Sequence, residues 1–133
     1  MIRGLSELVL IVADVSRSAA FYSDIVGLKL ERPATDQWAW FTVGPTSGRQ
    51  RLALHRGPLL FEEHSPRPPG ERFGRVHFAM EVPRQDLDSQ VERVRSAGVA
   101  VYGPVRLEWM LADSWYFYDP DGNLVEFWSP DQP

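Results

Sequence analysis

The chain has 133 residues and contains no cysteine. Disulfide bonds, thiolate zinc sites, iron–sulfur clusters and a cysteine nucleophile are therefore excluded. Any metal ion must be bound by histidine, aspartate, glutamate or another oxygen or nitrogen group. A chain of this length buries roughly two thirds of its unfolded surface, so it can build a hydrophobic core without covalent crosslinks.

The sequence also lacks any tract of clustered basic residues, and its net charge is −4 at pH 7. We therefore expect neither a nucleic acid nor a membrane as a partner. No apolar run approaches the roughly 18 residues of a membrane span, and residues 1–7 do not resemble a secretory signal. These absences predict a cytoplasmic protein with a small-molecule substrate or ligand.

The same order of predicted elements occurs twice along the chain. Each half begins with a strand, over residues 7–13 and 76–82, and continues with a helix, over residues 18–26 and 86–97. A glycine follows each helix, and about three further strands complete each half, the first of them in the second half beginning within residues 99–101. The sequence therefore predicts an α+β fold of two tandem β-α-β-β-β modules, whose curved mixed sheets enclose a cleft.

We expect a single domain over residues 1–133, with module 1 at about 4–61 and module 2 at about 74–130. Residues 62–73 between them are rich in proline and glycine, which is typical of a linker or a long surface loop. A pair of such modules leaves sheet edges exposed, so a homodimer is expected.

Three polar residues interrupt strands that are otherwise apolar: Glu7, His77 and Glu126. Such residues cost free energy unless they find partners. Two carboxylates and an imidazole together suit a divalent ion with open coordination positions. Each residue also has a plainer interpretation, because an acid at a strand can face solvent and a strand histidine can be hydrogen-bonded in the core. The repeat favours the metal site, since corresponding strands of similar modules bring their polar residues together.

Three sequence strings carry a resemblance to a known family: LVLIVAD at 8–14, VHFAMEV at 76–82 and YFYDPDGNLVEF at 116–127. The chain resembles the vicinal oxygen chelate superfamily, also called the glyoxalase / bleomycin resistance protein / dioxygenase family, over about residues 4–130. The last string, with a tight turn between two strands, is the most specific of the three. The resemblance implies a glyoxalase-like fold, which serves many different reactions.

The resemblance also implies a set of metal ligands. In this family they come from the first strand of each module and from the final strand, at positions that match Glu7, His77 and Glu126. One divalent ion per site, Mn, Fe, Ni, Zn or Co, would be bound there, although some members bind none. Glu7 departs from the histidine or glutamine that is most frequent at its position.

Some glyoxalase members have a fourth ligand on the last strand of the first module. One alignment places Ala53 at that position and leaves it empty, and another places His55 there. His55 is thus a candidate metal ligand, substrate contact or general base, or else a histidine exposed at a strand end.

The function implied by the resemblance is that of a divalent-metal-dependent enzyme acting on a small oxygen-bearing metabolite. The ion would chelate the substrate and stabilise an oxyanion, and Glu7 or Glu126 would transfer a proton. Lyase, isomerase and dioxygenase reactions occur in the family, as does thiol addition to fosfomycin-like epoxides. The last reaction predicts basic and hydroxyl groups for a phosphonate, and the sequence shows no such cluster beyond the two candidates Arg51 and Arg106.

The alternative is a metal-free binding protein, like bleomycin resistance proteins, that sequesters an aromatic or cationic molecule. The negative net charge and the five tryptophans agree with it. Residues two apart on a strand share a face, so Trp38 with Trp40, and Tyr116 with Tyr118, are candidate substrate-binding pairs under either hypothesis. The plainer interpretation of these aromatic residues is packing on a sheet.

Overall fold

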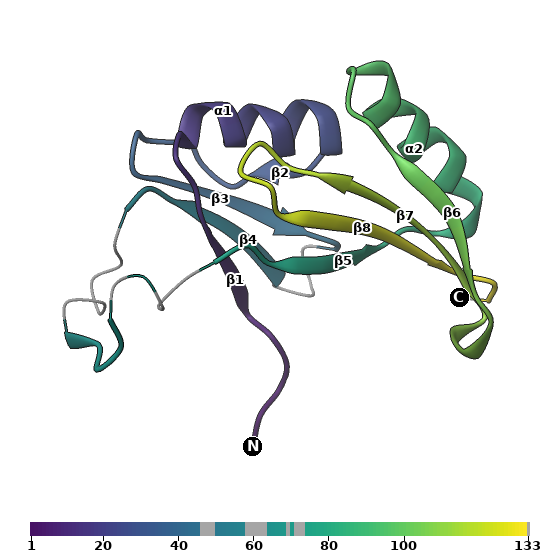
Figure 1. Cartoon of the computed structure of the whole chain (residues 1–133), viewed down its shortest axis with the longest axis horizontal. Coiled ribbons are helices and arrows are strands. Elements are labelled where there is room, and N and C mark those ends of the chain that lie inside the picture. Colours follow the sequence, from purple (N-terminus) through teal and green to yellow (C-terminus); the bar gives the residue numbers. More distant parts are fainter. Residues whose placement is uncertain (46–49, 58–63, 69, 71–73, 133) are drawn as a thin grey trace. The chain divides into compact units, whose positions relative to one another are not determined.

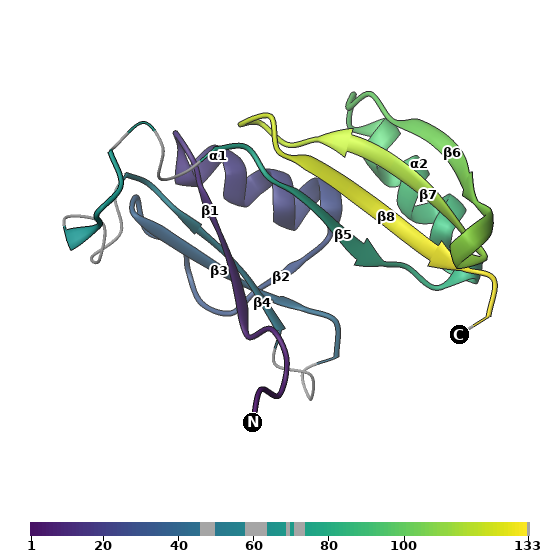
Figure 2. The same cartoon turned by 60° about the horizontal axis from the view of Figure 1, so that its bottom comes forward.

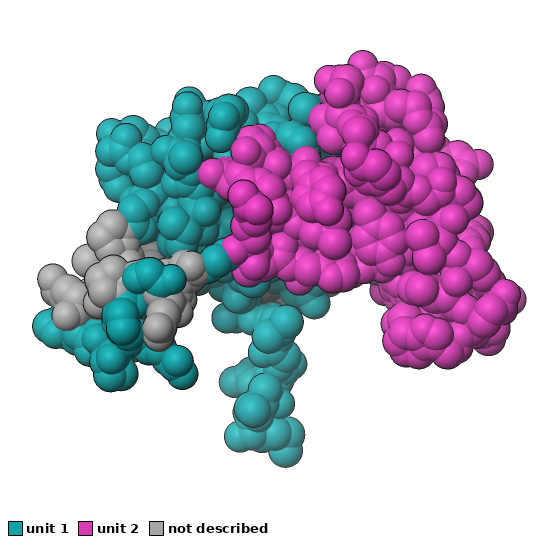
Figure 3. Space-filling model, viewed as in Figure 1, with its two compact units in different colours: residues 1–74 teal, residues 75–133 magenta. Residues whose placement is uncertain are grey.

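The computed structural model describes residues 1–45, 50–57, 64–68, 70 and 74–132. Backbone contacts divide the chain into two compact units, Met1–Gly74 and Arg75–Pro133, coloured separately in Figure 3. Much of the predicted linker, residues 62, 63, 69 and 71–73, lies outside the described residues. Among the helices of the described part, none has the length and apolar character that crossing a membrane requires.

The first unit is a mixed four-stranded sheet with a helical segment on one face (Figure 1). The strand order is β1-β4-β3-β2, with β1 parallel to β4 and the other pairs antiparallel. Its elements in chain order are β1 (Glu7–Ile11), α1 (Val15–Ala20), the π-helical η1 (Phe21–Val26), β2 (Lys29–Leu30), β3 (Trp38–Val43) and β4 (Gln50–His55).

The second unit repeats this plan (Figure 2). The strand order is β5-β8-β7-β6, with β5 parallel to β8 and the other pairs antiparallel. Its elements are β5 (His77–Glu81), η5 (Arg84–Asp86), α2 (Leu87–Ser96), β6 (Tyr102–Leu107), η6 (Glu108–Met110), β7 (Ala112–Tyr118) and β8 (Leu124–Pro130). The predicted α+β fold of two β-α-β-β-β modules with mixed sheets is confirmed.

Local sequence sets the limits of the first helical segment. Asp14 accepts a hydrogen bond from the backbone N–H of Arg17 at 3.1 Å and so caps α1. The helix therefore begins at Val15, three residues before the predicted start. Gly27 ends η1 with a φ of 91°, a left-handed conformation that glycine adopts without strain.

Each sheet packs one face on its helix, and alternate strand residues form the core. In the first unit the buried side chains come from both layers: Leu10, Phe41, Leu52 and Leu54 of the sheet, and Val15, Ala19, Tyr22 and Val26 of the helical segment. In the second unit they are Phe117, Val125 and Phe127 with Leu87, Val91 and Val94. The period of two therefore leaves Glu7, His77 and Glu126 on the sheet faces opposite the helices.

β6 begins at Tyr102, whereas the sequence predicted a strand starting within residues 99–101. The strand is at a sheet edge, and its pairing with β7 shifts register between Tyr102 and Val105. Proline is tolerated at such edge positions and bulges, which accounts for Pro104. Gly103 has a φ of 143°, and a Cβ atom there would lie 2.8 Å from the carbonyl oxygen of Ser114.

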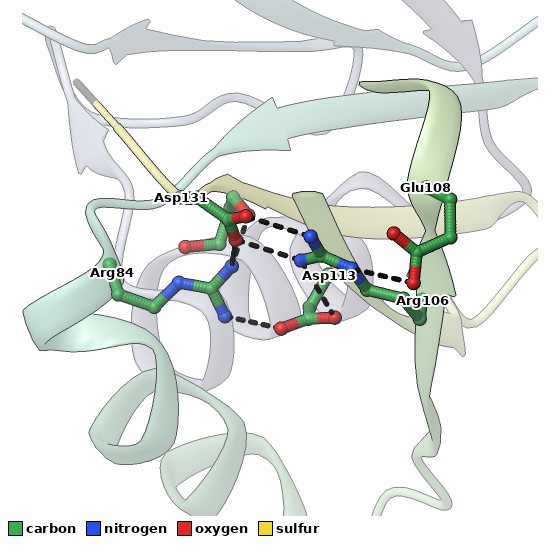
Figure 4. A network of polar contacts seen from close by, with 6 residues as sticks. Arg84, Arg106, Glu108, Asp113 and Asp131 are labelled. Carbon is green, nitrogen blue, oxygen red and sulfur yellow. Dashed lines mark hydrogen bonds and ion pairs between the residues drawn. The ribbon is translucent and has the colours of Figure 1, made fainter. Parts of the chain in front are cut away.

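An ion-pair network joins the end of the chain to the second unit (Figure 4). Arg84 donates to Asp113 at 2.6 Å and to Asp131 at 2.8 Å. Arg106 donates to both carboxylate oxygens of Asp131 at 2.7 Å and lies 3.5 Å from Glu108. The network therefore connects η5, β6 and β7 to the residue that follows β8, and it engages the guanidinium of Arg106.

The first prediction concerns the close approach of β6 to β7. Gly103→Ala should lower the free energy of unfolding by about 3 kcal/mol or more, because the added methyl group would lie 2.8 Å from the Ser114 carbonyl oxygen and 3.1 Å from the Trp115 ring. Gly98→Ala is the matched control: it has a φ of 85° with open space around the position, so only about 1 kcal/mol of backbone strain is expected. Urea unfolding measures both, and equal effects would contradict the prediction.

The second prediction concerns the pH dependence of the network. The hydrogen bonds from Arg106 hold the pKa of Asp131 below its ordinary value of 3.8. A depressed carboxyl pKa stabilises the fold above that ordinary value, and the stabilisation is lost as the pH falls through the folded-state pKa. Asp131→Asn should therefore melt at a lower temperature than the wild type at pH 7. The difference should shrink below pH 4, and a difference that grows on acidification would contradict this.

Candidate active site

The site is centred on Glu126, a glutamate on β8 that is only 7% exposed. Ser114 donates to its Oε1 at 2.5 Å, and the Tyr116 hydroxyl donates to the same oxygen at 3.2 Å. β7 and β8 are antiparallel neighbours, and Tyr116 lies directly opposite Glu126 in their register. A buried carboxylate needs such donors because removal from water is costly for a charge, and hydrogen bonds to a charged group contribute about 1.5–3 kcal/mol each.

His77 contacts the other carboxylate oxygen of Glu126. Its Nε2 lies 2.9 Å from Oε2, and the His77 side chain is 52% exposed while that of Glu126 is 9% exposed. The imidazole is therefore the solvent-facing member of the pair. Burial, followed by the negative charge of Glu126, raises the pKa of the Tyr116 phenol. The phenol thus stays protonated near neutral pH and remains a donor to Oε1.

A pocket of about 420 Å³ opens beside this pair. It is lined by His77, Ala79, Leu107, Trp109, Met110, Tyr116, Glu126 and Trp128. Sequence reasoning identified His77, Tyr116 and Glu126 but missed the apolar wall from η6 and the end of β6. The available signal was the run Leu107-Glu108-Trp109-Met110-Leu111, in which apolar residues flank a single acid. Tyr118 is not among the lining residues and packs edge-on against Tyr102.

The other predicted residues lie in the first unit. Glu7 is exposed and accepts a hydrogen bond from the Trp40 indole N–H at 3.2 Å. Trp38 and Trp40 stack with centroids 4.9 Å apart, His55 lies 4.0 Å from Trp38, and the Arg32 guanidinium lies 5.0 Å from the Trp40 centroid. These four side chains contact one another in a row, His55, Trp38, Trp40 and Arg32. Both tryptophan rings are therefore already covered by other side chains of this chain.

The two registers settle which residue of the first unit corresponds to Glu126. Glu126 lies opposite Ala79, two residues after His77. In the first unit the residue opposite Val9, two after Glu7, is Ala53. The structure therefore favours the alignment that leaves this position without a ligand.

His55 lies two residues beyond Ala53, at the position that Trp128 occupies in the second unit. It is buried, and its Nδ1 lies 3.0 Å from the carbonyl oxygen of Gly57. These contacts give His55 a packing role in the first unit. The burial of His55 contradicts one alternative from the sequence, an exposed histidine at a strand end.

Within each unit, the described residues do not gather three histidine, aspartate or glutamate side chains around one point. The structure brings together His77 and Glu126 in the second unit and places Glu7 beside Trp40 in the first. Two of the three predicted ligands thus form a pair, and the third, Glu7, lies in the first unit.

A profile of the glyoxalase/bleomycin resistance protein/dioxygenase superfamily matches residues 4–127. The chain belongs to this superfamily. The predicted family is therefore confirmed, and the matched segment includes Glu7, His77 and Glu126.

Relatives within the superfamily include two thiol transferases. The glutathione transferase FosA of Serratia marcescens is 28% identical over 129 residues, which is 95% of this chain and 80% of that protein. The metallothiol transferase FosB of Shouchella clausii is 27% identical, with the same coverage of each chain. The solved structure of a glyoxalase/dioxygenase from Nostoc punctiforme is 30% identical with a TM-score of 0.71, covering 98% of this chain and 92% of that one.

The third prediction tests how Glu126 is held. Ser114→Ala should lower the free energy of unfolding by about 2 kcal/mol, because it removes a short, buried donor from a buried carboxylate. Tyr116→Phe should cost less than about 1 kcal/mol, because its bond is longer and its side chain is partly exposed. Urea unfolding of both variants measures this, and a larger loss for Tyr116→Phe would contradict it.

Proposed function

We propose that the protein is a divalent-metal-dependent enzyme acting on a small oxygen-bearing molecule, with His77 and Glu126 as metal ligands. The observation that carries this proposal is the 2.9 Å separation between His77 Nε2 and Glu126 Oε2. Ligands at about 2.0–2.2 Å from one ion lie roughly 3 Å apart when they are neighbours in its coordination sphere. The 2.9 Å spacing of this hydrogen-bonded pair is therefore compatible with two neighbouring ligands of one ion.

The surrounding groups also fit a metal site. Ser114 and Tyr116 both donate to Oε1 of Glu126, so they orient the carboxylate and leave Oε2 directed at His77. Hydrogen bonds of this kind fix first-shell ligands and affect affinity strongly. Imidazole with carboxylate suits Mn, Fe, Ni, Zn or Co. The metal-dependent thiol transferase among the relatives agrees with this choice.

Glu7 is proposed as the third ligand or as the group that transfers a proton. It occupies the position in β1 that corresponds to His77 in β5. Glu7 lies two residues before Val9, which pairs with Ala53. His77 likewise lies two residues before Ala79, which pairs with Glu126. Its carboxylate has one hydrogen bond from Trp40, and its second oxygen has lone pairs for further partners.

A divalent ion held by His77 and Glu126 would supply Lewis-acid chemistry, polarising the substrate oxygens and stabilising negative charge that develops on them. Ser114 and Tyr116 keep the Glu126 carboxylate fixed by their hydrogen bonds. A carboxylate at Glu7 accepts and returns the proton. Isomerase, lyase, dioxygenase and thiol-transfer reactions all remain compatible with these roles. The homodimer and the cytoplasmic location stay predictions.

The fourth prediction tests the metal site by isothermal titration calorimetry. Wild-type protein freed of metal should bind about one Mn²⁺ or Ni²⁺ per chain. His77→Ala and Glu126→Gln should each weaken binding by about 100-fold or more, because each removes a ligand, and Glu7→Gln should weaken it by about tenfold, because an amide oxygen is a poorer ligand than a carboxylate. Asp88→Asn, on the exposed surface of α2, is the control and should bind as the wild type does.

The metal should also raise the melting temperature of the wild type and leave that of Glu126→Gln unchanged, since only a bound ligand stabilises the folded state. Absence of any saturable binding of Mn, Fe, Ni, Zn or Co would contradict the proposed function. The metal-free binding protein would then be the better hypothesis. The Trp38–Trp40 pair supports that alternative only weakly, because its ring faces are already occupied by His55 and Arg32.

A further inference from the structure

The pocket beside His77 and Glu126 is chemically divided into two parts. The polar part consists of those two residues with Tyr116, and the remaining lining residues are Ala79, Leu107, Trp109, Met110 and Trp128. Among the described residues that line it, none is a lysine or an arginine. The polar part matches the oxygens of a substrate, and the rest offers apolar contact apart from two indole N–H groups, of which that of Trp128 is buried without a hydrogen-bond partner in the described part of the chain.

The arginine nearest in sequence is directed elsewhere. Arg106 precedes Leu107 on β6, and successive strand residues point to opposite faces of a sheet. Leu107 lines the pocket, whereas Arg106 pairs with Asp131 on both guanidinium nitrogens and lies 3.6 Å from Asp113 (Figure 4). Its charge is therefore neutralised within the network and does not serve an anion in the pocket.

Two residues of the apolar wall are more exposed to solvent than core residues are. Trp109 is 82% exposed, and Met110 beside it is also exposed. Both lie on the short η6 helix, which Leu111 ends with a positive φ of 49°. An exposed tryptophan next to a pocket that contains a buried carboxylate is typical of a ligand contact, because the indole gains most when an aromatic or branched group covers it.

We propose that this pocket binds a neutral aromatic or branched apolar group of the substrate, attached next to the oxygens that reach His77 and Glu126. The proposal rests on the proposed function and adds the substrate class. A small dianionic compound such as a phosphonate epoxide is disfavoured, because the described pocket wall offers no lysine or arginine to pair with the charge that one divalent ion leaves over. This chain then differs in substrate from a thiol transferase that acts on fosfomycin-like epoxides.

The test compares two neutral chelators that share one pair of oxygens, acetohydroxamic acid and benzohydroxamic acid. Their affinities are measured by calorimetry for Mn²⁺-loaded protein and for protein in EDTA. The phenyl compound should bind at least about tenfold more tightly in both conditions, because only it covers the apolar wall. Trp109→Ala should reduce this ratio to about threefold or less and leave acetohydroxamic acid unaffected.

The matched control is Tyr102→Ala, which removes another exposed aromatic side chain of the same unit, 54% exposed against 82% for Trp109, that does not line the pocket. It should keep the wild-type ratio. The melting temperature of each variant shows that it is folded, and Trp109 is exposed enough for its loss to be tolerated.

Three results would overturn the proposal. They are equal affinities for the two hydroxamates, an unchanged ratio in Trp109→Ala, and displacement of acetohydroxamic acid by fosfomycin more readily than by benzohydroxamic acid. An unchanged ratio combined with conversion of a dimer to a monomer in Trp109→Ala would assign this surface to a second copy of the chain. If Mn²⁺ fails to tighten either compound while the ratio persists, the metal proposal fails and the apolar pocket stands.

Discussion

The buried carboxylate of Glu126 imposes the constraint on which the second unit depends. Placing a charge inside an apolar sheet costs several kcal/mol unless donors surround it. The central strand β8 makes this possible, because it has β5 on one side and β7 on the other. Ser114 and Tyr116 come from β7 and His77 comes from β5, so both neighbours of β8 contribute. The fixed register of three strands is thus also the support of a chemical site.

The first unit shows what the same scaffold does without that charge. Ala53 occupies the position that corresponds to Glu126. Trp40 lies opposite Ala53 just as Tyr116 lies opposite Glu126, so Trp40 corresponds to Tyr116. The freed space on this face holds the row of His55, Trp38, Trp40 and Arg32 in place of a hydrogen-bonded carboxylate. Two units with one topology therefore carry different side chains at the same positions, and among their described residues the pair of imidazole and carboxylate, His77 with Glu126, lies in the second.

The repeated order of predicted elements was enough to predict the fold, and the polar residues in apolar strands singled out His77 and Glu126, which the structure places together. These patterns could not identify Ser114, because a small buried serine looks like any strand residue until its partner across the sheet is known. The role of His55 also depended on strand register. A shift of two residues in the pairing decides whether Ala53 or His55 corresponds to Glu126, and a shift of one residue turns the side chain to the other face of the sheet. The start of β6 was misplaced because its edge position and bulge, which accommodate Pro104, are tertiary features.

In the proposed function, substrate choice follows from the alternation of side chains along β6. The strand sends Arg106 to the face where aspartates neutralise it and Leu107 to the face of the pocket. A substrate with more negative charge than the bound ion neutralises would find no lysine or arginine among the described lining residues. An apolar group needs no such partner and gains contact with Trp109. The proposed pocket would therefore discriminate by leaving a wrong substrate's charge unpaired.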